Sequence, residues 1–373
     1  MDKIEVIKKA LEVGFEDIGF TTMEPFESQK DILNSRREEY EWVINSGFNL
    51  EQGLDPKNIM PEGKSIIVLI DFHFREAYPS SLEGQFGRAY LDDDRITRDN
   101  IYQRIKAFRG YLRDNGVNSK SPFNIPHRLT AARAGLGTFG RNNFLYSNRI
   151  GRKSSWLTPI PLIVDYEFEP DEPTVEIGCP KWCKNTCVVS CPTGALRAPN
   201  TIDPRKCISY LSYYQEGITP LELREPLGTW VYGCDRCQEV CPRNRPWLSQ
   251  DLPLNKRVVA KEKDFDLTSL LHMDLNYYQK KIWPHMFYQS YNETWRWKMN
   301  VARSMGNSQD LKYIPELVKA FKENSDERVT RMIAWALGRL GGKESKKALE
   351  CFLEIGNGEV REEISLALKK ISL

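Results

Sequence analysis

The spacing of apolar residues over the first 170 positions predicts helices that alternate with strands. Apolar positions recur at helical intervals over residues 3–13 and 102–115, which predicts two amphipathic helices. The run IIVLI at positions 66–70 follows a Pro-Glu-Gly turn, and an unbroken apolar run over 65–74 predicts a strand covered on both faces. We therefore expect a layered α/β domain over residues 1–170.

Residues 171–250 carry a different pattern, without long periodic segments. Prolines interrupt regular structure at Pro170, Pro173, Pro180, Pro192, Pro199 and Pro204. Eight cysteines fall in the same stretch, and small loop-rich modules of this kind need a metal to fold. This pattern predicts a separate metal-binding module.

Residues 251–373 are expected to form a third domain, which turns helical from about Asp264. The segment VARSMG at 301–306 aligns with ALGRLG at 336–341 and with ALKKI at 367–371, a period of 31 to 35. Residues 314–318 and 348–352 supply a second helix for each unit, and such pairs must stack to bury their apolar faces. This predicts a short HEAT-like α-helical repeat, and an α+β multidomain fold overall.

Overall charge and composition limit the classes of binding partner that the sequence indicates. The 373 residues include 53 basic and 51 acidic side chains, so no global field indicates a nucleic acid or a membrane, and such binding would need a local patch. The N-terminus lacks a basic-then-apolar signal, and no window approaches the roughly 18 apolar residues of a membrane span. We expect a cytoplasmic, monomeric protein with no membrane partner.

The cysteine count points to metal ligands rather than disulfides. Eight of the nine cysteines lie within the 63 positions from Cys179 to Cys241, and the total is odd. Cys351 stands apart in a helical pattern, where we expect a small buried hydrophobe.

The eight clustered cysteines form two halves that each end in C-x3-C-P. This ending is typical of bacterial two-cluster ferredoxins, in which each fourth cysteine binds the other cluster, and soft thiolates suit iron-sulfur cores. We predict two [4Fe-4S] clusters with crossed ligation. One would use Cys179, Cys183, Cys187 and Cys241, and the other Cys191, Cys207, Cys234 and Cys237.

A pair of structural zinc sites is the alternative, because four cysteines also satisfy tetrahedral zinc. Zinc sites do not require the paired C-x3-C-P endings, which favours the clusters. The first half departs from the usual ferredoxin spacing, since it reads C-x3-C-x3-C where C-x2-C-x2-C is typical. Cys179 is therefore the ligand that the spacing supports least.

Several motifs together resemble the epoxyqueuosine reductase family, which shares its core with reductive dehalogenases. They are AGLGTFGRNN at 134–143, Ser155-Trp156, DYEFEPD at 165–171, PTGAL at 192–196 and YGCDRCQEVCPRN at 232–244, followed by the helical repeat. The resemblance spans nearly the full chain and is strong over residues 126–247.

The resemblance implies a base-off cobalamin in the N-terminal domain, reduced through the clusters to a nucleophile that attacks the substrate. In this family the substrate is epoxyqueuosine in tRNA and the product is queuosine, and the repeat domain helps to hold the tRNA. An external low-potential electron donor is implied as well. The implied cofactor-binding residues are Arg88, Tyr90, Gly135, Gly137, Gly140, Arg141, Asn142, Asn143, Ser155 and Trp156.

The chain departs from the family where the substrate would meet the cofactor. Family members carry an aspartate about thirteen residues before AGLG, taken to protonate the opening epoxide, whereas no aspartate lies between Asp114 and Asp165 here. A positioned donor is worth about 10²- to 10⁴-fold in rate, and His127 in this segment is the candidate catalytic residue. The family run Arg-Asp-Tyr-His is also reduced to Arg98-Asp99-Asn100-Ile101.

These departures keep two other functions open. One is a related corrinoid iron-sulfur reductase, similar to the dehalogenases, that acts on a small molecule. The other is an electron-transfer or corrinoid-reactivating protein whose repeat docks another protein. Binding to tRNA would weaken steeply with salt as phosphate counterions are released, whereas binding of a small molecule would not.

Overall fold

A four-stranded sheet organises the N-terminal part of the protein. The computed structural model describes residues 1–45, 51–147, 154–174, 178–198 and 201–371. The strands run in the order β1-β2-β6-β3, and each pairing between them is antiparallel. Their bounds are β1 (Asp17–Thr22), β2 (Ser65–Phe72), β6 (Leu157–Val164) and β3 (Ser119–Lys120).

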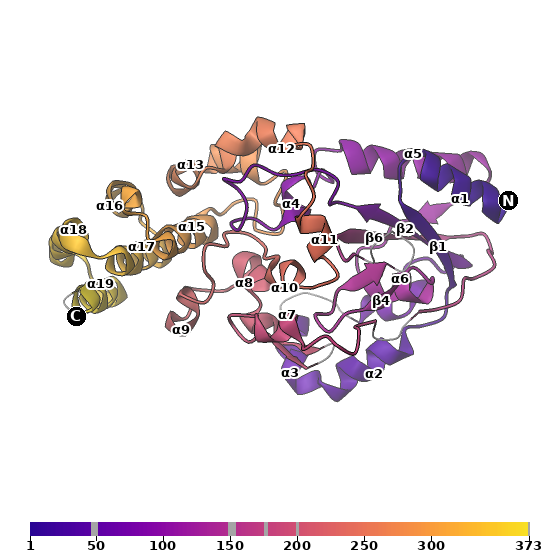
Figure 1. The fold of residues 1–373 in the computed structure, drawn as a ribbon, viewed down its shortest axis with the longest axis horizontal. Helices are drawn as coiled ribbons and strands as arrows, with labels where there is room; N and C mark the ends of the chain where they lie inside the picture. Colours follow the sequence, from indigo (N-terminus) through magenta and orange to yellow (C-terminus); the bar gives the residue numbers. More distant parts are fainter. Residues whose placement is uncertain (46–50, 148–153, 175–177, 199–200, 372–373) are drawn as a thin grey trace.

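Strand β2 lies in the middle of two apolar layers, as its sequence predicts. All eight of its residues are buried, and its side chains alternate between two cores: Ile66 and Val68 enter one, Ile67 and Leu69 the other. Helices α1 (Lys3–Glu12) and α5 (Asn100–Asp114) cover one face, and α2 (Glu27–Ser35) and α6 (His127–Arg133) cover the other (Figure 1). Because antiparallel neighbours need no helical crossover, this part is α+β, and the expectation of α/β is corrected.

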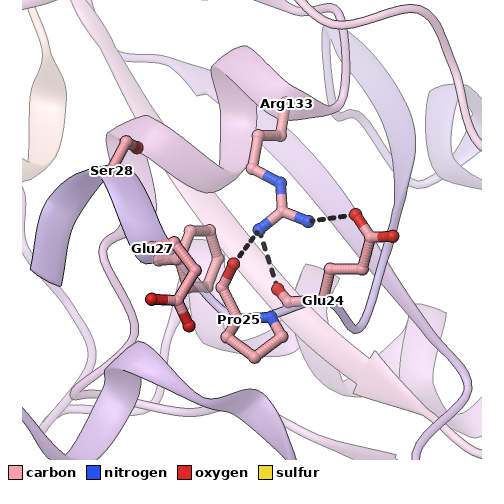
Figure 2. Close-up of a pocket in the computed structure, with 6 residues that line it drawn as sticks. Glu24, Pro25, Glu27, Ser28 and Arg133 are labelled. Carbon is pink, nitrogen blue, oxygen red and sulfur yellow. Dashed lines mark hydrogen bonds and ion pairs between the residues drawn. The ribbon is translucent and has the colours of Figure 1, made fainter.

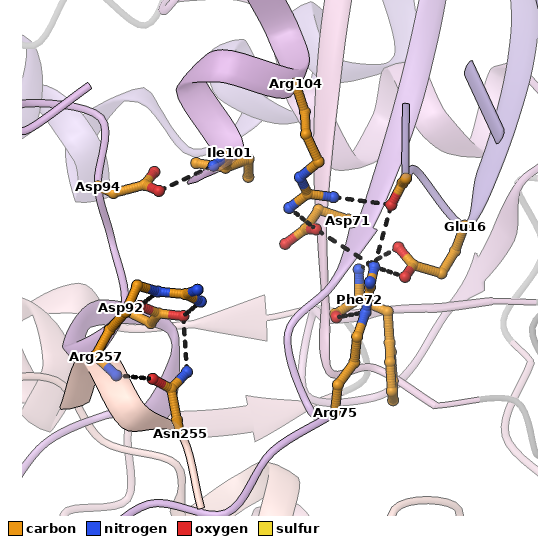
Figure 3. Close-up of polar contacts among 11 residues, drawn as sticks. Glu16, Asp71, Phe72, Arg75, Asp92, Asp94, Ile101, Arg104, Asn255 and Arg257 are labelled. Carbon is orange, nitrogen blue, oxygen red and sulfur yellow. Dashed lines mark hydrogen bonds and ion pairs between the residues drawn. The ribbon is translucent and has the colours of Figure 1, made fainter. Parts of the chain in front are cut away.

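Polar contacts at the end of β2 tie the sheet to its surroundings (Figure 3). Arg104 of α5 donates to Asp71 at 2.6 Å. Asp92 accepts from Arg257 at 2.9 Å and from Asn255, the N-cap of α12 (Lys256–Lys261), also at 2.9 Å. These bonds join the sheet layer to a segment more than 160 residues away.

Two short helices and a small hairpin follow the larger elements of this part of the chain. Helix α3 (Arg37–Asn45) follows α2, and α4 (Arg88–Leu91) follows β2. Strands β4 (Gly137–Phe139) and β5 (Leu145–Ser147) form a small hairpin after α6.

The cysteine-rich segment consists of short elements joined by turns. The longest, α8, has only seven residues, in keeping with the prediction of a loop-rich module. The elements are α7 (Thr186–Val189), β7 (Leu196–Ala198), β8 (Thr201–Ile202), α8 (Ile208–Tyr214), α9 (Leu221–Arg224), α10 (Arg236–Glu239) and α11 (Arg245–Leu248). An apolar core of such small elements is limited, so bound groups must contribute to their stability.

Stacked helices form the C-terminal part, as the repeat predicts. After α13 (Leu267–His272) and α14 (Leu275–Tyr277), the repeat comprises α15 (Trp295–Ser308), α16 (Ile314–Glu323), α17 (Glu327–Leu340), α18 (Gly342–Ile355) and α19 (Gly358–Ile371). Figure 1 shows this stack extending away from the sheet. The helical region begins at Lys256, slightly before the expected position.

One glycine on α15 and one on α17 allow the inner helices of the repeat to approach closely. A Cβ on Gly306 of α15 would lie 2.8 Å from Cα of Ala336, and one on Gly338 of α17 would lie 2.9 Å from Cα of Ala367. Both distances are too short for a real Cβ. The absence of a side chain at these two positions therefore permits the contacts of α15 with α17 and of α17 with α19.

Cys351 is exposed on α18, so the expectation that it is buried was wrong. The buried residues of α18 are Ser345, Leu349 and Phe352, and Cys351 lies beside this stripe on the outer helix of the stack.

Candidate metal centre and the adjacent recess

The eight clustered cysteines are free thiols that separate into two neighbourhoods. Burial is the main cause that raises the pKa of Cys187 to about 11, and the thiols that raise it further are Cys241, Cys179 and Cys183. Burial likewise raises the pKa of Cys237, and there the neighbouring thiols are Cys234, Cys207, Cys187 and Cys191. Cys187 is also among the neighbours of Cys237, so the two groups of thiols adjoin there, and the assignment of each cysteine to a cluster stays a prediction.

The donor set suits iron-sulfur clusters, because each predicted quartet consists of cysteines alone and soft thiolates match iron-sulfur cores. Within the described ranges, no three His, Cys, Asp or Glu side chains converge closely enough to hold one metal ion.

Residues of the AGLGTFGRNN segment contact the cysteines directly. The backbone N–H of Arg141 donates to Sγ of Cys179 at 3.4 Å, and the guanidinium of Arg141 bonds Oδ1 of Asn185. The buried Asn142 donates to the carbonyl of Cys237 at 3.1 Å. The segment thus supports both cysteine quartets, a role that its spacing did not indicate.

The glycines of this segment are explained by packing within the protein. Gly135 ends α6 with φ of +72°, a conformation that other residues rarely adopt. A Cβ on Gly137 would lie 2.5 Å from the carbonyl oxygen of Tyr146, and one on Gly140 would lie 2.3 Å from the Tyr146 ring. Asn143 also has a positive φ, +64°, and closes the turn to Gly140 through a 3.0 Å backbone bond.

Ser155 and Trp156 lie at the junction between the sheet and the cysteine-rich segment. Oγ of Ser155 accepts from Asn244 at 2.8 Å and from Gln238 at 3.0 Å. Trp156 is fully buried, with its ring 5.2 Å from that of Phe74. The amides of Gln238 and Asn244 were not identified from the sequence as site residues, although the resemblance motif contains both.

Two buried polar atoms near Trp156 lack a partner among the described residues. They are Nε1 of Trp156 and Nδ1 of His73, whose rings stand 6.2 Å apart. Burial lowers the pKa of His73 to about 4, so the imidazole is neutral at pH 7. Arg88 lies above the Phe74 ring at 4.5 Å. An unpaired buried N–H is costly, and a group bound here would provide its acceptor.

Arg128 lies close to the second cysteine set. Its side chain is exposed to solvent, and its guanidinium donates to the carbonyl of Asn143 at 2.5 Å. Desolvation by the surrounding protein lowers its pKa, and the groups that act on its charge are Cys237, Tyr90, Tyr213 and Cys207. We call Arg128, these four residues and Ser209 the Arg128 recess.

Hydroxyl groups gather on one wall of the Arg128 recess. The Tyr90 hydroxyl lies 3.3 Å from both Ser209 Oγ and the Tyr213 hydroxyl, which are 3.0 Å from each other. Burial raises the pKa of Tyr90 to about 12, so the three remain neutral donors. A Cβ on Gly233 would lie 2.4 Å from the Tyr90 ring, which explains the glycine next to Cys234. The sequence signal that could have indicated this wall is the group of tyrosines Tyr210, Tyr213 and Tyr214 shortly after Cys207.

His127 lies beside the Arg128 recess but is held by the backbone. Its Nε2 is 3.1 Å from the carbonyl oxygen of Pro122. Burial lowers its pKa, opposed by backbone hydrogen bonds to Pro122 and Pro159 and aided by the charges of Arg95 and Arg128. At neutral pH the imidazole is therefore neutral, and one N–H is already engaged.

A separate hollow lies at the other end of α6 (Figure 2). It is lined by Glu24, Pro25, Phe26, Glu27, Ser28 and Arg133. Arg133 donates to the carbonyl of Glu24 at 2.8 Å and to Oγ1 of Thr22 at 3.1 Å, and its guanidinium stands 4.6 Å above the Phe26 ring. The guanidinium of Arg133 thus fastens α6 to the end of β1.

Family models match two parts of the chain. A 4Fe-4S double cluster binding domain matches residues 179–244, and HEAT repeats match residues 290–369. Both agree with the modules that the sequence predicts, whereas the exact domain limits stay predictions. Among the described helices, none is long and apolar enough to cross a bilayer.

Curated relatives match nearly the whole chain. The epoxyqueuosine reductase of Bacillus subtilis (strain 168) is 29% identical over 391 residues, covering 99% of this chain and 94% of that protein. The epoxyqueuosine reductase of Escherichia coli (strain K12) is 27% identical and covers 92% of this chain and 90% of that protein.

Solved structures agree in fold over the same length. A structure of the B. subtilis enzyme with its catalytic aspartate loop swung out of the active site has a TM-score of 0.82, 28% identity, and coverage of 99% of this chain and 98% of that one. An epoxyqueuosine reductase with an epoxyqueuosine-modified tRNA-Tyr stem loop has a TM-score of 0.81, 26% identity, and coverage of 100% and 99%.

Proposed function

Because the chain belongs to the epoxyqueuosine reductase family, we propose that it reduces epoxyqueuosine in a tRNA stem loop to queuosine, with two [4Fe-4S] clusters and a cobalamin as cofactors. The observation that carries this proposal is the match to epoxyqueuosine reductases over nearly the whole chain, which includes the double cluster binding domain at residues 179–244. The related structure with a modified tRNA stem loop supports tRNA as the substrate carrier.

The cysteine sets supply the path for electrons. The quartet Cys179, Cys183, Cys187 and Cys241 would bind one cluster, and Cys191, Cys207, Cys234 and Cys237 the other. Ser209, two residues after Cys207, lies within hydrogen-bond distance of the Tyr90 and Tyr213 hydroxyls, so the second quartet would lie next to the proposed reaction site. Soft thiolates at these positions match iron-sulfur chemistry.

The cobalamin would lie between the end of β2 and the Arg128 recess. When bound, it supplies a strongly nucleophilic metal centre for attack on the epoxide. The unpaired Nε1 of Trp156 and Nδ1 of His73 fit the polar edge of such a large group, and Arg88 lies above the Phe74 ring that packs on Trp156. The resemblance adds Tyr90 and Arg141 as further donors. The glycines act indirectly, by placing Tyr146, Arg141 and Asn142.

A proton must reach the oxygen released by the opening epoxide. His127 remains our candidate donor, through the protonated fraction of its imidazole, which the lowered pKa makes small at pH 7. The hydroxyls of Tyr90 and Tyr213 and the guanidinium of Arg128 face the same recess, and they can hold the oxygen while the proton is transferred.

A deletion strain without a second epoxyqueuosine-reducing enzyme tests this function. We expect its tRNA to contain epoxyqueuosine and no queuosine, and a plasmid copy of the gene to restore queuosine. Unchanged queuosine in the deletion strain would exclude this substrate and favour a corrinoid reductase with a small-molecule substrate, the reading that the missing aspartate keeps open.

A further inference from the structure

We propose that the loop around the first cysteine set is the docking surface for a small acidic electron-transfer protein. The surface consists of Lys181, Trp182, Lys184 and Val189, which we call the Trp182 patch. This inference rests on the proposed function, because it assumes that electrons enter the protein through the clusters.

Two large apolar side chains of the Trp182 patch face the solvent. Trp182 is 66% exposed and Val189 is 79% exposed. Single apolar residues on a surface are ordinary, but tryptophan is among the residues that dominate binding energy in interfaces. Trp182 directly precedes Cys183, and Val189 lies between Cys187 and Cys191. The residues of the patch therefore lie within a few positions of Cys183, Cys187 and Cys191 in the sequence.

The charge of this loop has one sign. Residues 178–198 include three basic side chains, Lys181, Lys184 and Arg197, and no acidic one. Arg197 pairs with Glu39 of α3. Lys181 and Lys184 are exposed, and neither forms an ion pair with another described residue. An apolar centre with a positive rim is complementary to a partner that presents carboxylates around an exposed redox group.

The position of the patch fits electron entry. The second cysteine set lies next to the Arg128 recess, because Ser209, two residues after Cys207, lies 3.3 Å from the Tyr90 hydroxyl. Helix α7, which carries Cys187, packs against α10, which carries Cys237, and so joins the two sets. An electron taken up beside Trp182 would thus pass from the outer cluster to the inner one. In each encounter the carrier is oxidised by one electron and the outer cluster is reduced by one. Redox complexes of this kind are small and short-lived, so a limited patch suffices.

The test measures cluster reduction in the anaerobically reconstituted full-length protein by stopped-flow absorbance. The probe is a reduced flavodoxin of net negative charge, and dithionite serves as a small reductant that needs no docking. We compare Trp182→Ser and the pair Lys181→Glu with Lys184→Glu. Matched controls on α18 are Ile355→Ser, 68% exposed in the native protein, and Lys346→Glu with Lys347→Glu.

We expect each patch variant to lower the second-order rate with flavodoxin by about tenfold or more, as for an interface hot spot, while the dithionite rate stays unchanged. The native rate should also fall with added salt, and the lysine variant should lose this dependence. The α18 controls should behave like the native protein. If Trp182→Ser also lowers the rate of reduction by dithionite, the double lysine variant provides the test of docking, since the lysines bind no iron.

A lysine variant with the native flavodoxin rate would overturn the proposal. So would a variant that keeps this rate but loses affinity for a tRNA stem loop, because the patch would then serve nucleic acid. Conversion of epoxyqueuosine driven by dithionite checks the proposed function separately. Its failure in the native protein, with intact flavodoxin docking, would refute the substrate and leave the docking surface standing.

Discussion

The buried ion pair between Arg224 and Glu363 gives the sharpest test of how the repeat is attached. Arg224 of α9 donates to Glu363 of α19 through two parallel bonds of 2.6 and 3.1 Å. Their side chains are only 4% and 6% exposed. Nε of Arg224 is used by the carbonyl of Thr219 at 2.9 Å. The pair therefore joins the cysteine-rich segment to the last helix of the chain.

Arg224→Met should destabilise this attachment by about 3–5 kcal/mol, because a buried carboxylate loses its partner. Arg331 lies 4.0 Å from Glu363 and partly offsets the charge of the carboxylate, so we expect a value near about 3 kcal/mol. Glu363→Met should cost a similar amount. The double variant should cost clearly less than the sum of the two, since it leaves no buried charge.

Hydrogen exchange of the α19 amides is the suitable assay, because a chain of several modules does not unfold in one step. A loss of about 3 kcal/mol corresponds to protection lowered by about a hundredfold. Lys370→Met is the control. Lys370 pairs with Glu225 at 2.7 Å near the same contact, but both side chains are more than 40% exposed, so about 0–1 kcal/mol is expected. Equal effects of Arg224→Met and Lys370→Met, or an additive double variant, would refute this reasoning.

Three other outcomes are expected. Gly306→Ala should destabilise the protein by about 1–3 kcal/mol in thermal unfolding, because the new Cβ is overpacked against Ala336. Gly110→Ala in α5 is the control and should be neutral or stabilising, because its Cβ meets only open space and a flexible arginine. Equal changes in unfolding temperature for the two variants would contradict the packing argument. The apoprotein should lose about 2 kcal/mol of its free energy of unfolding between pH 7 and pH 5 through His73, because the folded pKa of about 4 lies below the unfolded value near 6.5 and the unfolded chain takes up the proton first. The variant His73→Phe should remove this part of the pH dependence. An unchanged slope in the variant would exclude a neutral buried imidazole. Cys234→Ser should leave about half of the iron after anaerobic reconstitution, and full iron content would contradict its assignment as a ligand.

Elements with a strong local pattern were predictable from the sequence. The apolar run of β2, the periodicity of α1 and α5, and the repeated apolar segments of α15, α17 and α19 each reflect packing that a short segment encodes. The paired C-x3-C-P endings likewise indicated the cluster module, since the ligand spacing is itself local.

Features made by distant residues were not predictable. The antiparallel order depends on β2 pairing with β6, more than 80 residues later. The Arg128 recess forms only when Tyr90, Arg128 and Tyr213 meet. The glycine segment suggested a ligand site, whereas its glycines accommodate Tyr146, a contact that spacing alone does not reveal.

The most direct test of the central claim is conversion of epoxyqueuosine in a tRNA stem loop, followed by mass spectrometry of the nucleosides. The protein is reconstituted anaerobically with both clusters and cobalamin, and dithionite supplies the electrons. We predict that queuosine appears with the loaded protein and not when cobalamin is omitted. Epoxyqueuosine that stays unchanged, although iron, sulfide and cobalamin are fully bound, would contradict the account.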